Sequence, residues 1–427
     1  MKISVIGTGY VGSVSAACFA ELGHEVICVD IDQSKIDQIN AGIPPVYEAG
    51  LPELMEKHAG KNLSATSDYD LAVRNSEVSF ICVGTPSDHQ GNIDLSIVKA
   101  ASAGLGDAIR RKKGYHVVVV KSTVVPGTTE KVVLPIIIER SGKHPDDFGI
   151  AMNPEFLREG RAVHDFMHPD KIVIGSLDRR SGDTVASLYR GLECEITRTN
   201  PTTAEMIKYA NNAFLAARIS FVNEIGNICK ELGIDTYEVM KAVGRDFRIG
   251  PHFLNSGAGF GGSCFPKDVK ALIGKASEMG YEPVLLRSVI AVNDEQPLRM
   301  VRLLKNRLGS IRGKKIAVLG LAFKNDTDDI RESRSIPVIK ELLRDGAQVS
   351  AYDPMANENM RKVFSNIQYC SSARDALYGA DACMIMTEWE EFRSLDKEFD
   401  VMENRLIIDG RHMLGPRKDI EYLGLCW

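Results

Sequence analysis

Residues 3–12 read ISVIGTGYVG, an apolar run of strand length that leads directly into three glycines with the spacing G-x-G-x-x-G. Residues 13–23 (SVSAACFAELG) have helical composition, and residues 25–30 (EVICVD) form a second apolar run that ends in an aspartate. This order of strand, glycine-rich turn, helix and strand is the one that a pyrophosphate-binding βαβ unit requires. The chain is therefore predicted to open with a dinucleotide-binding domain.

Each glycine of the turn has its own predicted role. Gly7 permits the tight turn, Gly9 lets a pyrophosphate approach the backbone, and Gly12 lets the helix pack closely on the strand. The helix N-terminus supplies N–H donors to the anion. Asp30 stands about twenty residues beyond the glycines, where an acid bonds a ribose 2′-hydroxyl and repels a 2′-phosphate. NAD is thus favoured over NADP, although the nearby Lys35 softens that preference slightly.

Two further apolar runs, residues 78–86 and 116–128, carry polar residues at their C-terminal ends. Doubly wound sheets keep their ligand crevice at that edge. We therefore expect Thr85 and Thr123 to lie near the nicotinamide, whereas turn chemistry alone explains Ser122 equally well.

The composition of the 427-residue chain is that of an ordinary globular protein, with 44% hydrophobic and 26% charged residues. Its net charge of −5 gives no general affinity for nucleic acid or for an anionic membrane. No apolar run is long enough to span a bilayer. The nine cysteines show no CxxC pair and no metal-ligand spacing. We expect a cytoplasmic protein without a metal site, a nucleic-acid partner or a membrane partner.

The C-terminal third repeats the order of elements at the N-terminus. Asp353 occupies the place of Asp30, but Gly320 is followed by Leu-Ala-Phe-Lys, so the G-x-G-x-x-G motif is missing. We expect a second Rossmann-like domain that binds something other than NAD, such as a nucleotide-bearing substrate. Its predicted strands are residues 314–323, 347–354, 381–389 and 404–411.

Residues 201–232 have helical composition, with apolar residues at helical spacing, a start at Pro201 and a stop at Gly233. The fold class is therefore predicted as α/β, with two doubly wound domains joined by a long central helix. The broad apolar face of this helix is explained equally by a contact between subunits and by packing within the chain. The predicted domains are residues 1–200, 201–305 and 306–427.

Residues 257–268 (GAGFGGSCFPKD) surround Cys264 with glycines and place Lys267 and Asp268 behind it. Dense glycines let a backbone approach a ligand and point its N–H groups inward. A thiol held there as thiolate can attack a carbonyl carbon. A surface loop with a chance cysteine explains the stretch equally well when it is taken alone, and the predicted cofactor site favours the nucleophile.

Four other side chains are candidates for chemistry. Lys208 and Asn212 are four residues apart on the predicted helix, so they share a face and can stabilise an oxygen that gains negative charge. Spacing alone favours a solvated helix edge. Glu155 and Glu159 can supply a base and a ligand contact, but charged helix starts are common. The histidines at 24, 89, 164 and 168 show no partner pattern, and we assign them no catalytic role.

Cationic side chains suit a phosphate or a carboxylate, arginine especially through its bidentate fork. Ordinary surface ion pairs use the same residues. The candidates are Arg248, Lys324, Arg331 and Arg411.

In chain order, the blocks GTGYVG, CVGTP, KSTVVPGT, NPEFLREG, EMIKYANNAF, GFGGSCFPKD, LAFKNDTDDIRES and IDGR closely resemble those of the nucleotide-sugar dehydrogenases, and most of all the branch that acts on UDP-glucose. The resemblance covers essentially the full length. It implies the NAD-dependent four-electron oxidation of UDP-glucose at C6 to UDP-glucuronate, with two NAD reduced per sugar and water supplying the second oxygen. We also expect a homodimer through the central helix.

The resemblance also implies roles for individual residues. Cys264 is the nucleophile that holds the aldehyde as a thiohemiacetal and then a thioester, Glu155 is the base for hydrolysis, and Thr123 lies near the reacting water. Lys208 and Asn212 stabilise the reacting oxygen, assisted by Asp268. Implied cofactor contacts are Gly7, Gly9, Tyr10, Val11, Gly12, Asp30, Lys35, Thr85, Thr123, Glu159, Lys267 and Arg331. Implied substrate contacts are Glu155, Phe156, Leu157, Arg158, Glu159, Lys208, Asn212, Arg248, Phe253, Leu254, Asn255, Ser256, Gly257, Gly261, Phe323, Lys324 and Arg411. Phe253 stands where many relatives have tyrosine, so one hydrogen bond to the substrate is in doubt.

Three alternatives stay open. The same chemistry can act on GDP-mannose or on a UDP-N-acetylhexosamine. A β-hydroxyacid dehydrogenase also pairs a lysine with an asparagine four residues later, but it needs neither Cys264 nor a second nucleotide-binding domain. A non-catalytic sensor that binds NAD and a nucleotide sugar has no use for a nucleophile, a lysine and carboxylates together.

Overall fold

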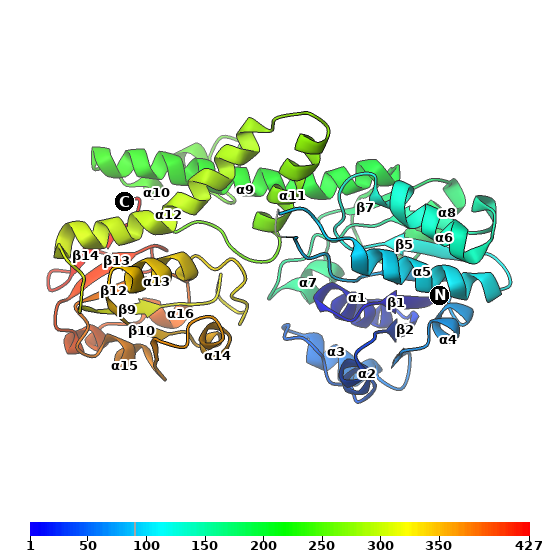
Figure 1. The fold of residues 1–427 in the computed structure, drawn as a ribbon, viewed down its shortest axis with the longest axis horizontal. Helices are drawn as coiled ribbons and strands as arrows, with labels where there is room; N and C mark the ends of the chain where they lie inside the picture. The colour runs from blue at the N-terminus through cyan, green and yellow to red at the C-terminus, as the bar shows by residue number, and fades with distance from the viewer. Residues whose placement is uncertain (89–90) are drawn as a thin grey trace. The chain divides into compact units, whose positions relative to one another are not determined.

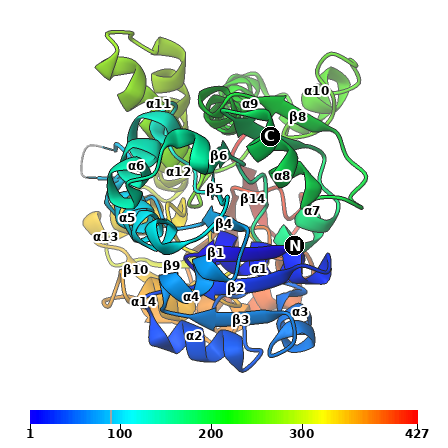
Figure 2. The ribbon, with the colours of Figure 1, turned by 90° about the vertical axis from the view of Figure 1, so that its right-hand side faces the viewer.

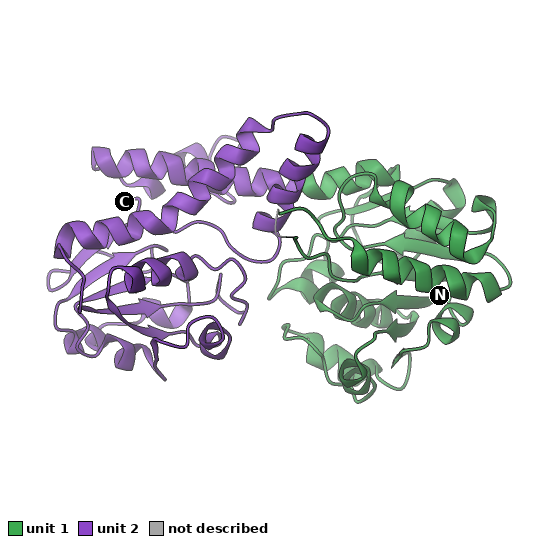
Figure 3. Ribbon diagram, viewed as in Figure 1, with its two compact units in different colours: residues 1–210 green, residues 211–427 purple. Residues whose placement is uncertain are grey.

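The computed structural model describes residues 1–88 and 91–427, so His89 lies outside the described part. The chain forms two compact units, residues 1–210 and 211–427 (Figure 3). Helix α9 (Pro201–Leu232) begins in the first unit and ends in the second (Figure 1). The long central helix predicted over residues 201–232 is thereby confirmed.

The first unit is built on a sheet with the strand order β3-β2-β1-β4-β5-β6-β7-β8. Its strands pair in parallel, except that β7 is antiparallel to β6. The order of the first six strands is that of a dinucleotide-binding doubly wound sheet. The strands are β1 (Lys2–Ile6), β2 (Glu25–Val29), β3 (Leu63–Thr66), β4 (Val78–Ile81), β5 (Val117–Val120), β6 (Gly149–Met152), β7 (Ile172–Ser176) and β8 (Ile196–Thr199).

Helices cover both faces of this sheet (Figure 2). Successive side chains of a strand point to opposite faces. Val117 and Val119 of β5 accordingly join an apolar cluster with α1, α3 and α7, while Val118 and Val120 join another with α4, α5 and α6. The helices are α1 (Tyr10–Glu21), α2 (Gln33–Asn40), α3 (Leu51–His58), α4 (Tyr69–Arg74), α5 (Ser96–Arg111), α6 (Leu134–Ser141), α7 (Ala162–Met167) and α8 (Arg179–Ser187), with a π-helical turn η1 (Thr129–Val133) before α6.

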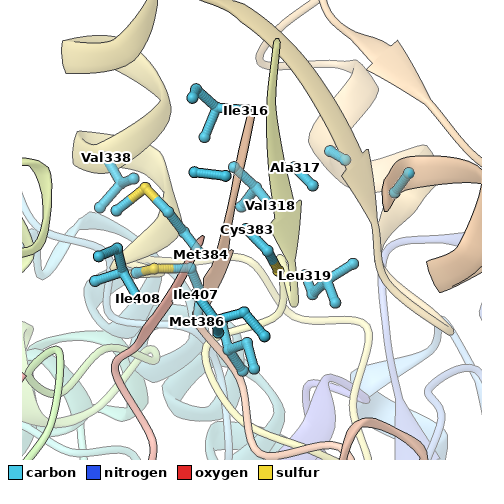
Figure 4. Packing of buried hydrophobic residues seen from close by; sticks show 14 of the residues in the cluster. Ile316, Ala317, Val318, Leu319, Val338, Cys383, Met384, Met386, Ile407 and Ile408 are labelled. Carbon is cyan, nitrogen blue, oxygen red and sulfur yellow. The ribbon is translucent and has the colours of Figure 1, made fainter. Parts of the chain in front are cut away.

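The second unit contains a parallel sheet with the strand order β11-β10-β9-β12-β13-β14, which repeats the order of the first six strands of the other sheet. Buried residues of β9, β12 and β13 pack against α13 (Figure 4). The prediction of two Rossmann-like domains is therefore confirmed. Strands β11 and β14 were not predicted. The strands are β9 (Lys315–Leu319), β10 (Gln348–Tyr352), β11 (Gln368–Tyr369), β12 (Ala382–Ile385), β13 (Leu406–Asp409) and β14 (Glu421–Gly424), and the helices of this sheet are α13 (Ser335–Arg344), α14 (Asn357–Arg361), α15 (Ala373–Leu377) and α16 (Glu390–Arg393).

A smaller apolar core in the second unit holds the cysteine-bearing segment. Phe260 packs there with Ala213 and Ala216 of α9, Val269 of α11 and Val289 of α12. Three helices thus fix the chain just before Cys264. Helices α9, α11 and α12 supply this core, and the helices that follow α9 along the chain are α10 (Thr236–Val243), α11 (Phe265–Glu278) and α12 (Val284–Leu308). Among the described residues, no helix has the length and apolar character needed to cross a membrane.

Candidate active site

The glycine turn between β1 and α1 has the geometry that a pyrophosphate requires. Gly7 has a φ angle of +91°, a backbone conformation that residues other than glycine rarely adopt. A Cβ on Gly12 would lie 1.9 Å from the carbonyl oxygen of Gly7, so only glycine allows this close packing of helix and strand. A Cβ on Gly9 would meet no protein atom within 4 Å. The backbone at Gly9 is therefore open to a ligand, and the turn fits NAD.

Asp30 follows β2 and faces this turn. Its carboxylate accepts hydrogen bonds from the backbone N–H of Thr8 at 2.7 Å, from the Thr8 hydroxyl and from the N–H of Asp32. Burial opposes ionisation, but these bonds and the charge of Lys35 outweigh it and lower the pKa of Asp30. The ionised side chain is a strong acceptor for a ribose hydroxyl.

Other predicted cofactor contacts follow strands of the same sheet. Tyr10 and Val11 begin α1, and Thr85 and Thr123 follow the ends of β4 and β5.

Glu48 connects the glycine turn with the segment that follows β6, and the sequence analysis missed it. Its buried carboxylate accepts the hydroxyl of Tyr10 and the backbone N–H groups of Gly160 and Ala162, the last two at 2.7 and 2.8 Å. Burial and the neighbouring carboxylate raise the pKa of Tyr10. Glu48 stands in the irregular stretch before α3, where no periodicity or motif marks it.

Glu155 and Lys208 form a buried ion pair in the first unit. The Nζ of Lys208 lies 2.8 Å from Oε1 of Glu155, and the two side chains are 4% and 7% exposed. Burial opposes the ionisation of Glu155, but the charge and hydrogen bond of Lys208 and the N–H of Leu157 outweigh it and lower its pKa. The solvated helix edge that spacing alone favoured is therefore wrong for Lys208, because the helix buries this face.

A second lysine, Lys121, is buried at the end of β5 and was also missed. Its Nζ lies 3.1 Å from Oδ1 of Asn153, and the hydroxyl of Tyr189 donates to the same oxygen. The Lys121 ammonium also lies 5.9 Å from the ring centroids of Phe80 and Phe166. Burial lowers the pKa of Lys121, and its charge helps to keep Glu155 ionised. A lone lysine after four valines gives no sequence signal for this role.

Cys264 caps the N-terminus of α11 in the second unit. Its carbonyl accepts the first helical hydrogen bond, from the N–H of Asp268 at 2.8 Å, and the side chain is exposed. The Ser263 hydroxyl lies 3.6 Å from the sulfur. Of the nine cysteines, all of them in the described part of the chain, seven are buried and Cys194 is half-buried. A helix N-terminus favours negative charge, so this position favours the thiolate form of an accessible sulfur.

Asn212 and Asp268, both buried, and the half-buried Lys267 form a chain of hydrogen bonds near the start of α11. The Asn212 Nδ2 donates to Oδ2 of Asp268 at 2.7 Å, and Lys267 Nζ donates to the other carboxylate oxygen at 2.7 Å. Asn212 and Asp268 are 4% and 1% exposed. The carboxylate thus fixes the orientation of both the amide and the ammonium. The solvated helix edge is wrong for Asn212 as well.

The glycines around Cys264 pack against the protein rather than leaving their N–H groups free. A Cβ on Gly257 would lie 2.5 Å from the Gly410 carbonyl oxygen, and one on Gly261 would lie 2.4 Å from that of Glu332. The N–H of Gly262 donates to the carbonyl of Arg331 at 2.9 Å, and the N–H of Gly257 donates to Oδ1 of Asn223 at 2.8 Å. The expectation that the glycine N–H groups point inward to a ligand is therefore wrong for Gly257 and Gly262. Glycine is needed here because chain segments approach each other closely.

The predicted substrate segment 253–257 has mixed exposure. Phe253 has φ of +59° and is 39% exposed, while Leu254 is buried against Val222 and Met240. The side chain of Ser256 is buried and that of Asn255 is exposed. The strained backbone at Phe253 marks this position as one that the surrounding fold enforces.

The predicted anion-binding arginines all have protein partners. Arg248 and Arg331 form bidentate pairs with the aspartates two residues before them, Asp246 and Asp329. Arg158 pairs with Asp165 in the first unit. A ligand anion at any of these three positions would share the guanidinium with a carboxylate.

Arg411 and Lys324 belong to the second unit. Arg411 is half-buried and donates to the carbonyl oxygens of Met386, at 2.8 Å, and Gly259, at 3.1 Å. It thus braces the cysteine-bearing segment. The Lys324 ammonium lies 5.6 Å from the ring of Phe323, and Phe323 packs against Gly262.

Asp353 follows β10 in the second sheet, as Asp30 follows β2 in the first, but its carboxylate is used within the protein. It is 2% exposed and accepts the N–H groups of Leu321, Ala322, Met355 and Ala356 and the indole N–H of Trp389. No lone pair is left for a ribose. This arrangement agrees with a second domain that binds a ligand other than NAD.

Other residues from the sequence analysis have contacts of their own. The ammonium of Lys171 lies 4.6 Å and that of Lys208 5.4 Å from the ring centroid of Phe156. His24 Nε2 lies 2.9 Å from the Leu188 carbonyl oxygen, and the rings of His164 and His168 lie 5.0 Å apart.

Comparison with known families identifies the chain. The models of the NAD binding domain, the central domain and the UDP binding domain of the UDP-glucose/GDP-mannose dehydrogenase family match residues 1–193, 202–295 and 317–416. The chain belongs to this family. The NAD binding domain model covers the glycine turn, and the UDP binding domain model covers most of the second sheet.

Individual relatives in this family match over the whole chain. A UDP-glucose 6-dehydrogenase from Haloferax volcanii is 51% identical, with 100% of each chain covered. The solved structure of a UDP-glucose dehydrogenase from Pyrobaculum islandicum has a TM-score of 0.94 at 42% identity, covering 100% of this chain and 98% of that one. A UDP-D-ManNAc dehydrogenase from Pyrococcus horikoshii has a TM-score of 0.90 at 29% identity, with 100% and 99% covered.

Proposed function

We propose that this chain oxidises UDP-glucose at C6 to UDP-glucuronate and reduces two NAD for each sugar. Family membership and full-length relatives that carry this activity in their names support the reaction. The observation that carries the mechanism is Cys264, an exposed thiol at a helix N-terminus, four residues before the buried Asp268 that holds Asn212 and Lys267. A two-electron alcohol dehydrogenase has no use for that thiol.

The proposed reaction proceeds through covalent intermediates on Cys264. The C6 alcohol first loses a hydride and a proton to give the aldehyde. The thiolate adds to the aldehyde carbon, and the resulting oxyanion takes a proton to give a thiohemiacetal. Loss of a second hydride and the hydroxyl proton gives a thioester, which water cleaves to the acid and the free thiol. NAD, when bound, accepts a hydride in each oxidation. The covalent link keeps the aldehyde from escaping between them.

Lys208 and Asn212 are proposed to stabilise the sugar oxygen as it gains negative charge. They are one turn apart on α9, and their partners Glu155 and Asp268 hold each in a fixed orientation. Preorganised donors of this kind need no reorganisation at the moment of reaction. The Asn212 amide has a fixed direction because Asp268 accepts from its Nδ2 at 2.7 Å, while its Oδ1 accepts from Nδ2 of the neighbouring Asn211 at 3.4 Å.

Glu155 is proposed as the base that activates water for thioester hydrolysis, with Thr123 near that water. Its lowered pKa keeps it ionised at neutral pH, which a proton acceptor requires. The ion pair with Lys208 occupies Oε1, and Oε2 accepts from the N–H of Leu157. Each oxygen retains a lone pair for water.

A second copy of this chain is proposed to bind α9. Phe214, Phe221 and Ile228 are 65%, 57% and 52% exposed and recur every seven residues, so they share one face of the helix. Exposed apolar stripes of this kind mark interfaces. Phe221→Glu should convert a dimer to a monomer in light scattering, whereas Met279→Glu, at a 75% exposed position after α11, should leave the mass unchanged. A wild-type mass equal to that of one chain would refute the proposal.

Substrate comparison tests the sugar. NADH formation should be fastest with UDP-glucose when GDP-mannose and the UDP-N-acetylhexosamines are supplied at the same concentration. A higher kcat/KM for another sugar nucleotide would reassign the substrate while keeping the chemistry. Binding of NAD and sugar nucleotide without any NADH would favour the sensor instead.

A further inference from the structure

Three side-chain amides bind the backbone of the cysteine-bearing segment. The N–H of Gly257 donates to Oδ1 of Asn223 at 2.8 Å, and Nε2 of Gln296 donates to the Gly257 carbonyl at 3.0 Å. Asn293 binds both groups of Phe260, accepting from its N–H at 2.7 Å and donating to its carbonyl at 3.0 Å. Both backbone groups of two residues are thus bound by amides, which we call the amide clamp (Asn223, Asn293 and Gln296).

The clamp is buried and rests on regular helices. Asn223, Asn293 and Gln296 are 0%, 1% and 0% exposed. Asn223 belongs to α9, and the other two lie about one turn apart on α12. A second layer supports it, since Asn227 Nδ2 donates to Oε1 of Gln296 at 2.7 Å. Buried backbone groups outside helices and strands need such partners.

Irregular backbone makes the clamp necessary. Gly259, between the two clamped residues, has φ of +99°, and a Cβ there would lie 2.6 Å from Oδ1 of Asn293. Residues 257–262 form neither helix nor strand. Asn293 therefore supplies the two backbone hydrogen bonds to Phe260 that a neighbouring strand would otherwise supply. Its side chain also lies so close to residue 259 that only glycine fits there.

We propose that the amide clamp consists of positioning residues that set the place of Cys264, four residues beyond Phe260. Phe260 is also fixed by its ring in the small core with α11, so the clamp and the core together define where α11 begins. Neutral amides suit this task because they satisfy backbone donors and acceptors without burying a charge. The proposal rests on the proposed nucleophile, Cys264.

The test compares Asn293→Leu with Asn357→Leu in the full-length protein. Asn357 also binds two backbone groups, accepting from the N–H of Asp353 at 3.0 Å and donating to the carbonyl of Cys370 at 2.9 Å, but it belongs to α14 of the second sheet. Three measurements are made on each variant. The first gives kcat and the KM for NAD with UDP-glucose as the substrate, the second gives the rate at which iodoacetamide alkylates Cys264, as monitored by peptide mass spectrometry, and the third gives the melting temperature.

Asn293→Leu should lower kcat by about 100-fold, as a displacement on the order of 1 Å does, and change the alkylation rate of Cys264 while the KM for NAD stays the same. Asn357→Leu should lower the melting temperature but leave kcat and alkylation unchanged. Unchanged kcat and alkylation in Asn293→Leu, or equal losses in both variants, would overturn the proposal.

Gln296→Met provides a second variant if Asn293→Leu fails to fold. It conserves volume and removes the donor to Gly257, so it should lower kcat and change alkylation in the same sense. Unchanged kcat and an unchanged alkylation rate in Gln296→Met would overturn the proposal that the clamp positions Cys264. Alkylation does not depend on turnover, so it reports on the place of the thiol even if the proposed role of Cys264 fails.

Discussion

The ammonium of Lys208 lies 2.8 Å from a carboxylate oxygen of Glu155, and both side chains are more than nine-tenths buried. A buried charge that loses its hydrogen-bonded partner keeps its desolvation cost without the attraction that offset it. Loss of either side chain should therefore destabilise the first unit, apart from any effect on the catalytic roles proposed for the two residues.

Lys208→Met should lower the free energy of unfolding by about 3–5 kcal/mol, since it leaves Glu155 buried without the cation that is hydrogen-bonded to it. Lys2→Met is the matched control: it breaks the exposed pair with Glu25, whose side chains are 55% and 63% exposed, and should cost at most about 1 kcal/mol. Urea unfolding measures both. Equal losses in the two variants would show that Glu155 is solvated.

Acid should remove the contribution of Glu155 to stability. Its pKa is lower in the folded protein than in the unfolded chain, so its contribution is present above the unfolded value of about 4.3 and is lost as pH falls through the folded value. The stability difference between the parent and Glu155→Gln should be constant near neutral pH and shrink in acid. Urea unfolding over an acid series measures it, and a difference that grows as pH falls would contradict the assignment.

Gly9→Ala should weaken NAD binding without harming the fold. The added methyl group meets no protein atom within 4 Å, and the backbone there has negative φ, so the melting temperature should stay near that of the parent. The methyl group would occupy the space that a pyrophosphate needs. The Kd for NAD, measured by calorimetry, should therefore rise at least tenfold, which corresponds to a loss of about 1.4 kcal/mol in binding free energy. Gly415→Ala, also in open space, should change neither quantity. Unchanged NAD affinity in Gly9→Ala would place the cofactor elsewhere.

Cys264→Ser should bind NAD and UDP-glucose as the parent does but form no UDP-glucuronate. A serine hydroxyl at this place is a far weaker nucleophile than a thiolate, so the aldehyde is not carried through a thioester. Product analysis by chromatography with calorimetric binding measures both. Full acid formation by this variant would refute the covalent mechanism.

The fold was predictable because its signals are local. Strand, glycine turn and helix follow one another within residues 3–30, and the helix 201–232 has the predicted bounds. Strands β3, β6, β8, β11 and β14 were not predicted, and all five are short. Strand β11 has two residues, and β14 (Glu421–Gly424) carries a glutamate and a glycine among four residues. Such strands depend on the neighbours with which they pair.

Candidate site residues could be proposed from the sequence only where chemistry and motif coincide, as at Cys264. Glu48, Lys121 and Asn293 act through partners more than thirty residues away in sequence, and no spacing shows such pairs. Asp353 is the opposite case, because its sequence position resembles a ligand-binding one although the structure uses it otherwise. It follows a strand as Asp30 does, but five donors of its own domain bind its carboxylate.

The ratio of NADH formed to UDP-glucose consumed by the purified protein shows whether one sugar is oxidised by four electrons or by two. We expect two NADH for each sugar, with UDP-glucuronate as the product and no free aldehyde. One NADH for each sugar, with the aldehyde released, would contradict the covalent four-electron mechanism and leave Cys264 without its proposed role.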